Sequence, residues 1–377
     1  MTSVEVVLTG YGVLSPFGFG AAPILDNVFA GRSAISTVTR FDTDTFLCHH
    51  AATYEGGGSA QPFPQQEAIT ACARAAIAMS GIDVIEELPV IVGAKGDLAP
   101  KNGVMVRRPA FTVAEAVAED LGLGNPRRTF FNACVASSNA IIHACQLVAS
   151  GAARAVLCGG GYLVDEQVFA HFDSVRGLSR TGRMAPFSRK RPGVLLGDGA
   201  AMLVVESAVG ARERGATALA KVAGWGLTSD GFNIVRPDPS GRGMAAAISL
   251  ALRRARIGAE ELGYINAHGT GTESNDSAET AAYRLAFGEH AQNVPVSSTK
   301  ASTGHALEGC GALETVITLL ALTSSQLPPT IGLTDPDPDC NLRHVVEPGR
   351  SLETGFALSV NASVGGVNSA LLLERSS

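Results

Sequence analysis

The sequence has few charged and few aromatic residues for its length. Of its 377 residues, 17% are Asp, Glu, Lys or Arg and 6% are Phe, Trp or Tyr, whereas Gly occurs 43 times. This excludes an extended disordered chain, which combines low hydrophobicity with high charge. The net charge of -6 gives no overall attraction to nucleic acid or to an anionic membrane. The composition instead indicates closely packed, buried elements, and the length allows two structural units.

Three further features are missing from the chain. The seven cysteines are scattered and include no Cys-x-x-Cys pair, so neither a zinc site nor a disulfide framework is predicted. Residues 1–5 lack the basic start of a signal peptide. The apolar runs are rich in Ala and Gly and are interrupted, so none reads as a membrane span. We therefore expect a protein of the reducing cytoplasm with no metal site.

A dinucleotide site near the start of the chain is a weak alternative. A β-branched strand at residues 6–9 leads into Gly10-Tyr11-Gly12, but Ser15 stands where the nucleotide fingerprint needs its third glycine. The following residues, Ser15 to Gly18, indicate a turn and no helix. This pattern argues against nucleotide binding.

The segment from Phe130 to Gly151 contains no charged residue. It predicts a buried strand at residues 129–131, a turn that carries Cys134, and a helix that is buried all round and ends at Gly151. The turn would place Cys134 near the positive end of a helix dipole, where a nucleophilic thiolate is favoured. The alternative is that Cys134 is one more small core residue.

A similar strand, small-residue turn and apolar helix recur around Lys300 and His305. Alternating strands and helices in both parts of the chain predict two related α/β units whose uncharged helices pack together between two sheets. A charged break at residues 212–215 suggests the boundary, giving halves at residues 1–212 and 213–377.

Two histidines and a lysine follow strands in the second half. His268 lies in a Gly- and Thr-rich turn, and Lys300 and His305 lie together on a turn before the apolar helix. A buried lysine needs a partner, for which Glu314 is a candidate. Each histidine alone is more often structural, but with Cys134 they could form a nucleophile with two polarising groups.

These motifs resemble those of the β-ketoacyl-acyl carrier protein synthases, or ketosynthases. The resemblance rests on residues 132–138 around Cys134, 266–272 around His268, 298–305 around Lys300 and His305, and the glycine pair Gly365-Gly366, with further matches at 7–16 and 327–331. It spans nearly the whole chain, with the motifs in the family's order. It implies a thiolase-like duplicated α-β-α-β-α layered fold and no metal or organic cofactor, because the substrates are carried on the phosphopantetheine of an acyl carrier protein.

The resemblance also implies a role for each motif residue. Cys134 would take an acyl group, and His268 and His305 would stabilise the enolate formed when a malonyl unit loses carbon dioxide. Lys300, held by Glu314, would support the second histidine. The backbone N–H groups of Cys134 and Val364 would form an oxyanion hole. Phe187, Thr270 and Thr272 would contact the substrate. The gate of the acyl pocket would be formed by Val364, Gly365 and Gly366.

The implied partners are an acyl carrier protein and a second subunit, either an identical chain or a ketosynthase-like one. A basic surface could dock the acidic carrier protein, although a solvated charged loop is an equal alternative. Its residues are Arg180, Arg183, Arg189, Lys190 and Arg191, with Arg107, Arg108, Arg127 and Arg128.

The sequence departs from the family at several points. The family's gate carries Phe where this chain has Val364, with Ser363 in place of a glycine, so we expect a weaker gate and altered acyl selectivity. Residues 48–66 and 92–130 look shortened, and Ser188 replaces a frequent Asp. These departures indicate a specialised polyketide, polyene or fatty-acid-like pathway, in which a partner could complete the pocket. The alternatives are a non-catalytic subunit of the chain-length-factor type and an acyltransferase that does not decarboxylate.

Overall fold

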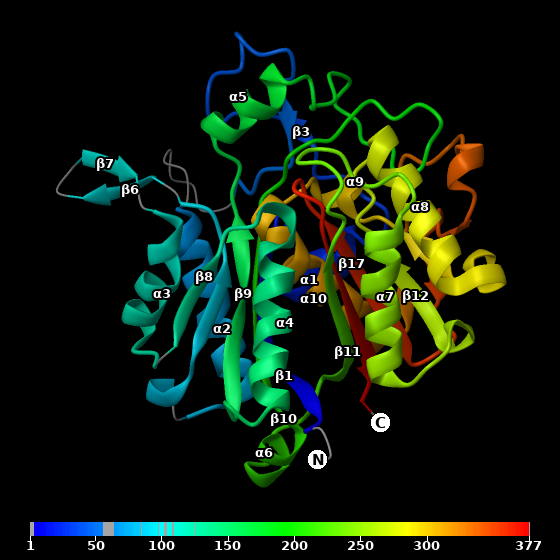
Figure 1. The fold of residues 1–377 in the computed structure, drawn as a ribbon. Coiled ribbons are helices and arrows are strands. Elements are labelled where there is room, and N and C mark those ends of the chain that lie inside the picture. Colours follow the sequence, from blue (N-terminus) through cyan, green and yellow to red (C-terminus); the bar gives the residue numbers. More distant parts are fainter. Residues whose placement is uncertain are drawn as a thin grey trace.

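The computed structural model arranges the chain in five layers, in the order helices, sheet, helices, sheet and helices (Figure 1). It describes residues 4–55, 64–83, 85–96, 98–101, 104–107, 109–124 and 126–376. The outer layers are α2 (Gln65–Ser80) with α3 (Val113–Leu121), and α7 (Arg242–Ala255) with α8 (Glu273–Phe287). The central layer is formed by α4 (Ala136–Ala149) and α10 (Cys310–Ser324). The layered α/β fold predicted from the sequence is therefore confirmed.

The strands on either side of the central helices form one hydrogen-bonded sheet. Its order is β15-β13-β12-β17-β18-β11-β1-β10-β9-β5-β8, with β2 paired to β1. The bounds are β1 Val6–Ser15, β2 Gly18–Phe19, β5 Val90–Gly93, β8 Arg127–Phe130, β9 Ala155–Tyr162, β10 Gly199–Ser207, β11 Ala220–Ser229, β12 Leu262–Asn266, β13 Pro295–Ser297, β15 Arg343–His344, β17 Phe356–Ala362 and β18 Val367–Arg375.

The sheet has an internal repeat that supports a duplication. From β1 outward, two antiparallel pairings (β1 with β10, β10 with β9) are followed by two parallel ones (β9 with β5, β5 with β8). From β11 outward the same sequence recurs through β18, β17, β12 and β13. The two halves meet where Val7 pairs with Lys221 and Leu8 with Ala220. This short pairing joins the two predicted sheets into one, while the boundary between residues 212 and 213 stays a prediction.

The helices of the central layer approach each other closely because small residues line their contact. A Cβ added to Gly311 on α10 would lie 2.7 Å from the backbone nitrogen of Ser138 on α4. The Ser137 hydroxyl accepts a hydrogen bond from the backbone N–H of Ala312 at 3.0 Å. The stretch Leu307–Ser324 is apolar and long enough to span a membrane, but 83% of it is buried within the protein. Its apolar character is thus explained by its place in the core.

The strand before the nucleophile segment differs from its prediction. Residues 129–131 were expected to be a buried strand, whereas β8 spans Arg127–Phe130 and is only partly buried. Phe131, directly after it, is 68% exposed. The reason is topological, because β8 is an end strand of the sheet and has a neighbour on one side only.

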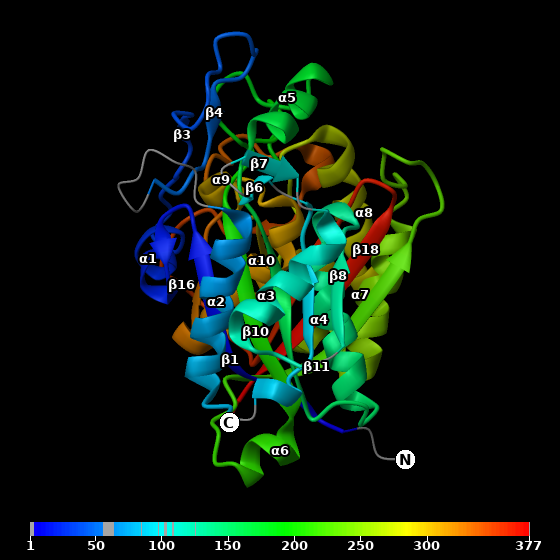
Figure 2. The same ribbon diagram turned by 90° about the vertical axis from the view of Figure 1, so that its left-hand side faces the viewer.

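The remaining elements are short and lie mainly on the outside of the layers. Above the ends of β5, β8 and β9 lie loops with α5, β3 and β4, whereas both termini lie at the opposite end of the molecule (Figures 1 and 2). The bounds are α1 Ala21–Asn27, β3 Ser36–Thr37, β4 His50–Ala51, β6 Leu98–Lys101, β7 Val104–Arg107, α5 Glu166–Ser174, α6 Ala208–Glu213, α9 Lys300–Thr303, β14 Gln326–Leu327 and β16 Arg350–Ser351.

Candidate active site

Cys134 lies on a strained turn between a strand and a buried helix. The turn is the 3-10 segment η3 (Ala133–Val135), which separates β8 from α4. Ala133 has a φ of 53°, in the left-handed region that residues other than glycine rarely adopt. Such strain persists only where the surroundings fix it, and it concentrates at functional sites. Cys134 itself is 8% exposed, as the charge-free sequence around it predicted.

The position of Cys134 at a helix start does not favour the ionised form of its thiol. Burial raises its pKa to about 12, and the negative charge of Glu308 adds to this shift, whereas Lys300 opposes it. The prediction that the helix start favours the thiolate is therefore wrong for this pocket. The loss of hydration around the buried sulfur outweighs the opposing positive charge of Lys300.

The two predicted histidines meet in space. Their ring centroids are 5.3 Å apart and the ring planes are nearly perpendicular, at 81°. His268 follows β12, and its backbone N–H donates to Glu279 on α8 at 2.7 Å, while the N–H of Gly269 donates to the same carboxylate at 2.8 Å. The backbone N–H of His305, which follows α9, donates to the Leu195 carbonyl at 2.8 Å.

Both imidazoles are held in the neutral form. Burial, reinforced by the positive charge of Lys300, lowers the pKa of His268 and of His305 well below the usual value. The Nδ1 atom of each ring is buried and has no hydrogen-bond partner within the described residues. A neutral imidazole can donate one hydrogen bond without carrying charge, which suits it to a developing negative charge.

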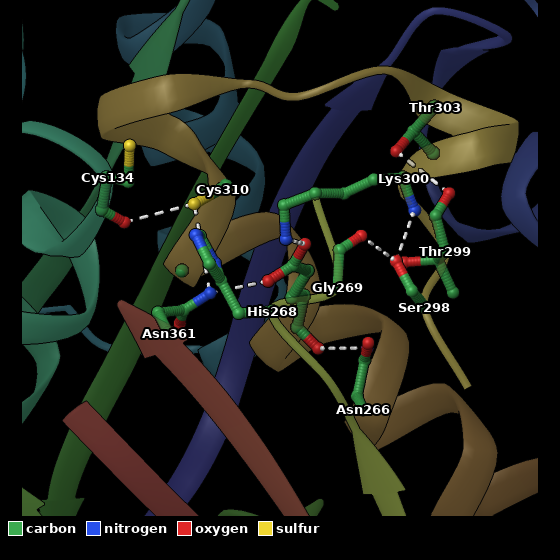
Figure 3. A network of polar contacts seen from close by, with 12 residues as sticks. Cys134, Asn266, His268, Gly269, Ser298, Thr299, Lys300, Thr303, Cys310 and Asn361 are labelled. Atoms are coloured by element: carbon green, nitrogen blue, oxygen red, sulfur yellow. Dashed lines mark hydrogen bonds and ion pairs between the residues drawn. The ribbon is translucent and has the colours of Figure 1, made fainter. Parts of the chain in front are cut away.

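A buried ion pair that includes Lys300 lies close to His268 (Figure 3). Lys300 is fully buried and its ammonium group contacts the Glu314 carboxylate. The other carboxylate oxygen accepts a hydrogen bond from the Asn361 side chain at 2.5 Å. Burial disfavours the ammonium form, but Glu314 outweighs it and raises the pKa of Lys300. The sequence-based pairing of Lys300 with Glu314 is present in the structure.

Cys310, which the sequence reasoning missed, links the nucleophile to the histidine side of the site. Its thiol donates to the backbone carbonyl of Cys134 at 3.0 Å (Figure 3). Ligating atoms of Cys310, His268 and Glu314 lie within 4.8 Å of one another. Such a trio could hold a cation, but Lys300 already pairs with Glu314 and its positive charge opposes one. The position of Cys310 in the sequence could have pointed to its role, since it begins the apolar helix five residues after His305.

Two other supporting residues also escaped the sequence reasoning. Glu279 fixes the backbone of the His268 turn and accepts a hydrogen bond from Tyr283 at 2.6 Å. Asn361, at the end of β17, orients Glu314. Asn361 lies 47 positions from Glu314, and Glu279 lies 11 positions from His268 on the next helix. Neither belongs to a motif whose spacing reveals the contact.

The predicted substrate contacts occupy different environments. The hydroxyl groups of Thr270 and Thr272 are 2.9 Å apart. Phe187 is fully buried, and its ring packs against His344 with a centroid distance of 4.9 Å. The roles of all three in binding substrate stay predictions.

The predicted gate forms the turn between β17 and β18. Val364 is 55% exposed, and Gly365 and Gly366 have φ values of 89° and 73°, which favour glycine. The Gly365 N–H donates to the Ile234 carbonyl at 2.9 Å, and the Gly366 carbonyl accepts from the Asp230 N–H at 2.7 Å. The turn is thereby fastened to a neighbouring loop, and its roles as gate and oxyanion hole stay predictions.

The predicted basic surface is only partly available. Arg180, Arg183, Arg189 and Lys190 are exposed. Arg191, by contrast, has a side chain that is 3% exposed and pairs with Asp337 at 2.5 Å, so its assignment to a docking surface is wrong. Arg128 is exposed and half-buried Arg127 binds the carbonyls of Leu123 and Gly124. The Arg107 side chain and Arg108 lie outside the described residues.

Comparison with known proteins places this geometry in a family. A five-layered fold with a cysteine at a helix start and two facing histidines is the arrangement expected of a thiolase-like condensing enzyme. Residues 3–211 match the model "Beta-ketoacyl synthase, N-terminal domain", and residues 219–334 match "Beta-ketoacyl synthase, C-terminal domain". The chain therefore belongs to the β-ketoacyl synthase family, and the family and enzyme class predicted from its motifs are confirmed.

Individual relatives extend over almost the whole chain. A 3-oxoacyl-[acyl-carrier-protein] synthase 2 of Synechocystis sp. is 33% identical over 98% of this chain and 98% of its own length. The tetracenomycin polyketide synthase ketoacyl synthase alpha subunit of Streptomyces glaucescens is 32% identical over 98% of this chain and 97% of its own. Among solved structures, the ishigamide ketosynthase/chain length factor has a TM-score of 0.91 and 29% identity, with both chains fully covered.

Proposed function

We propose that the protein condenses an acyl group held on Cys134 with a malonyl unit on an acyl carrier protein, with loss of carbon dioxide. One observation carries this assignment. Two neutral imidazoles, with ring centroids 5.3 Å apart, share a buried site with a cysteine at a helix start. Cys310 links them, because its thiol donates to the Cys134 carbonyl at 3.0 Å and lies within 4.8 Å of a ring nitrogen of His268. A thiol supplies the covalent acyl carrier, and paired neutral donors supply stabilisation for an enolate oxygen.

In the first half-reaction, Cys134 takes the acyl group. Its sulfur forms a bond to the thioester carbonyl carbon, the bond from that carbon to the carrier sulfur breaks, and the departing thiol takes up the Cys134 proton. Because the pKa of Cys134 is about 12, the free thiolate is scarce and must form in concert with the attack. The backbone N–H groups of Cys134 and Val364 would hold the oxyanion.

In the second half-reaction, His268 and His305 act on the malonyl unit. They donate hydrogen bonds to its thioester oxygen while the bond to the carboxylate breaks, and the electron pair passes into an enolate. The enolate carbon then attacks the Cys134 thioester, which forms the new carbon–carbon bond and releases the sulfur to take up a proton. Burial keeps both imidazoles neutral, and Lys300 acts as a positioning residue whose positive charge reinforces this effect.

The substrates carry their own phosphopantetheine, so the proposed reaction uses no further organic cofactor and no metal. The partner is an acyl carrier protein, as in a relative described as a type II polyketide synthase acyl-carrier protein in complex with its ketosynthase, 25% identical to this chain. Two other relatives are described with a chain length factor. We therefore propose a second ketosynthase-like subunit, identical or not, and a specialised polyketide, polyene or fatty-acid-like pathway.

The surface around β8 suits such a subunit. This edge strand has a free side, and Phe111 and Phe131 near it are 65% and 68% exposed. An exposed strand edge flanked by aromatic side chains is a typical place for pairing with another chain. A partner seated there would lie close to η3 and could complete a pocket that the shortened segments leave open.

Mass spectrometry and carbon dioxide release together test the proposal. Incubation with an acyl-carrier-protein thioester should add one acyl group at Cys134, and malonyl-carrier protein should then give carbon dioxide and a β-ketoacyl product. Cys134→Ala should lose acylation and condensation. A folded protein that is never acylated would indicate a chain-length-factor-like subunit, whereas acylation without carbon dioxide release would indicate a plain acyltransferase.

A further inference from the structure

Glu308 occupies in the second half of the chain the place that Cys134 occupies in the first. Cys134 is the middle residue of η3, which runs directly into α4, and Glu308 is the middle residue of η6 (Leu307–Gly309), which runs directly into α10. The residue before each, Ala133 and Leu307, has a positive φ, at 53° and 35°. The duplication thus gives Glu308 the same strained setting at a buried helix start.

The two turns pack against each other, so Glu308 lies beside the nucleophile. η3 and η6 are in contact, and the Cys310 thiol fastens the end of η6 to the Cys134 carbonyl at 3.0 Å. The charge of Glu308 acts directly on the Cys134 thiol, whose pKa it raises. No step of the condensation described above uses this carboxyl group.

On its other side, η6 contacts the end of β9. A Cβ added to Gly309 would lie 2.9 Å from the backbone nitrogen of Tyr162, the last residue of that strand. Tyr162 is fully buried, and the ammonium group of Lys95 lies over its ring, 5.5 Å from the centroid. Lys95 in turn pairs with Asp165.

Two polar atoms in this cluster lack a hydrogen bond of good geometry within the described residues, although the backbone of Asp165 lies close to one of them, the Tyr162 hydroxyl. They are the Oε2 atom of Glu308 and the hydroxyl of Tyr162, and both are shielded from solvent. Buried polar atoms nearly always form hydrogen bonds. Two that lack such bonds beside a nucleophile therefore point to a ligand that supplies the missing hydrogen bonds. A hydroxyl group suits either atom, because it can donate to a carboxylate and accept from a tyrosine.

We propose that Glu308 and Tyr162 form a polar subsite that selects acyl groups carrying a hydroxyl close to the thioester. The inference rests on the proposed function, since it concerns the acyl group that Cys134 receives. A plain hydrocarbon chain satisfies neither atom and leaves both buried without partners. A site built to bind a hydroxyl discriminates strongly against the analogue that lacks it.

Acylation of Cys134 by two thioesters of equal chain length tests the subsite. β-Hydroxyoctanoyl and octanoyl pantetheine are compared by the second-order rate constant of acylation, followed by intact-protein mass spectrometry. We expect the wild type to favour the hydroxyacyl thioester by roughly tenfold or more. Tyr162→Phe and Glu308→Leu should each bring the ratio close to one, while Glu308→Gln, which keeps a hydrogen-bonding group, should retain part of the preference.

The control is Tyr264→Phe, at a fully buried tyrosine whose hydroxyl lies 2.7 Å from that of Ser297 and belongs to no part of the subsite. Its ratio should equal that of the wild type. A wild-type ratio near one, or a ratio unchanged in both Tyr162→Phe and Glu308→Leu, would overturn the subsite while leaving condensation intact. Failure of either thioester to acylate the folded protein would instead contradict the proposed function, and the subsite with it.

Discussion

The rings of His268 and His305 lie nearly perpendicular to each other, with their centroids 5.3 Å apart, although 37 positions separate them in the chain. His268 follows the strand β12, whereas His305 follows the short helix α9. Both are fixed through their backbone, His268 by Glu279 and His305 by Leu195. These backbone contacts hold both turns in place, while burial beside the positive charge of Lys300 sets the pH behaviour of the two rings.

The lowered pKa of both histidines predicts a specific loss of stability in mild acid. The unfolded chain takes up a proton on each imidazole below about pH 6.5, whereas the folded chain does not. The stabilisation is therefore complete above that pH and falls as the pH drops toward the folded pKa, by about 1.4 kcal/mol per histidine and pH unit. Urea unfolding between pH 7.5 and 5.5 measures this slope.

Replacement of one histidine supplies the control for the pH slope. His305→Gln should unfold with a shallower dependence on pH than the wild type, because one of the two buried imidazoles is gone. Parallel slopes for the wild type and the variant would show that His305 titrates alike in the folded and unfolded chains, which would contradict a lowered pKa of His305.

The Lys300–Glu314 pair predicts a large and non-additive effect on stability. Lys300→Met leaves Glu314 buried without its partner, and loss of one member of a buried pair costs about 3–5 kcal/mol. The double variant Lys300→Met, Glu314→Leu should recover part of this cost, because no charge then remains buried. Denaturant unfolding of the wild type, Lys300→Met, Glu314→Leu and the double variant gives the coupling energy.

Lys221 offers a matched ion pair at the surface. It is 36% exposed and pairs with Glu5 at 2.9 Å and with Glu374 at 3.2 Å. Lys221→Met should cost less than about 1 kcal/mol, as is usual for exposed pairs. If Lys221→Met and Lys300→Met lower the free energy of unfolding equally, burial of the Lys300 pair does not add to its effect on stability.

The exposed basic residues predict a selective defect with carrier-bound substrate. Arg180→Glu with Arg183→Glu should raise KM for acyl-carrier-protein substrates severalfold, because an acidic carrier is attracted by positive charge. KM for an acyl pantetheine should stay the same, since that substrate lacks the carrier surface. Steady-state kinetics with both substrates make the comparison.

Arg154→Glu is the control for docking. Arg154 is exposed and pairs with Glu213 at 3.0 Å, and it lies next to the start of β9, at the opposite end of this strand from Tyr162. This charge reversal should leave KM unchanged for the acyl-carrier-protein substrate and for the acyl pantetheine. If the Arg180 and Arg183 reversals affect both substrates equally, the loop acts on the site itself and the docking explanation fails.

If residue 364 is part of a gate, enlarging its side chain should change which acyl groups the protein prefers. Val364 is 55% exposed on the β17–β18 turn, so Val364→Phe can be accommodated without strain in the core. The larger ring should narrow the range of acyl chains that reach Cys134 and shift the preference among thioesters of increasing length. Val346→Phe, at an exposed valine between β15 and β16, is the matched control. Identical chain-length profiles for Val364→Phe and the wild type would show that residue 364 is no gate.

The sequence by itself determined the local features of this protein. The absence of charge from residue 130 to 151 required a buried helix after Cys134, and the repeated strand, turn and apolar helix indicated two related units. The motifs around residues 134, 268, 300 and 305 identified the family and its candidate catalytic residues. Such features follow from neighbours along the chain, through periodicity and turn chemistry.

Only the tertiary structure decided how those residues act on one another. It showed that burial raises the pKa of Cys134 despite the nearby positive charge of Lys300, and that Arg191 is buried in an ion pair instead of lying on a docking surface. It also placed Cys310, Glu279, Asn361 and Glu308 around the site. These effects depend on distances between segments far apart in sequence and on the exclusion of water, and no local pattern encodes either.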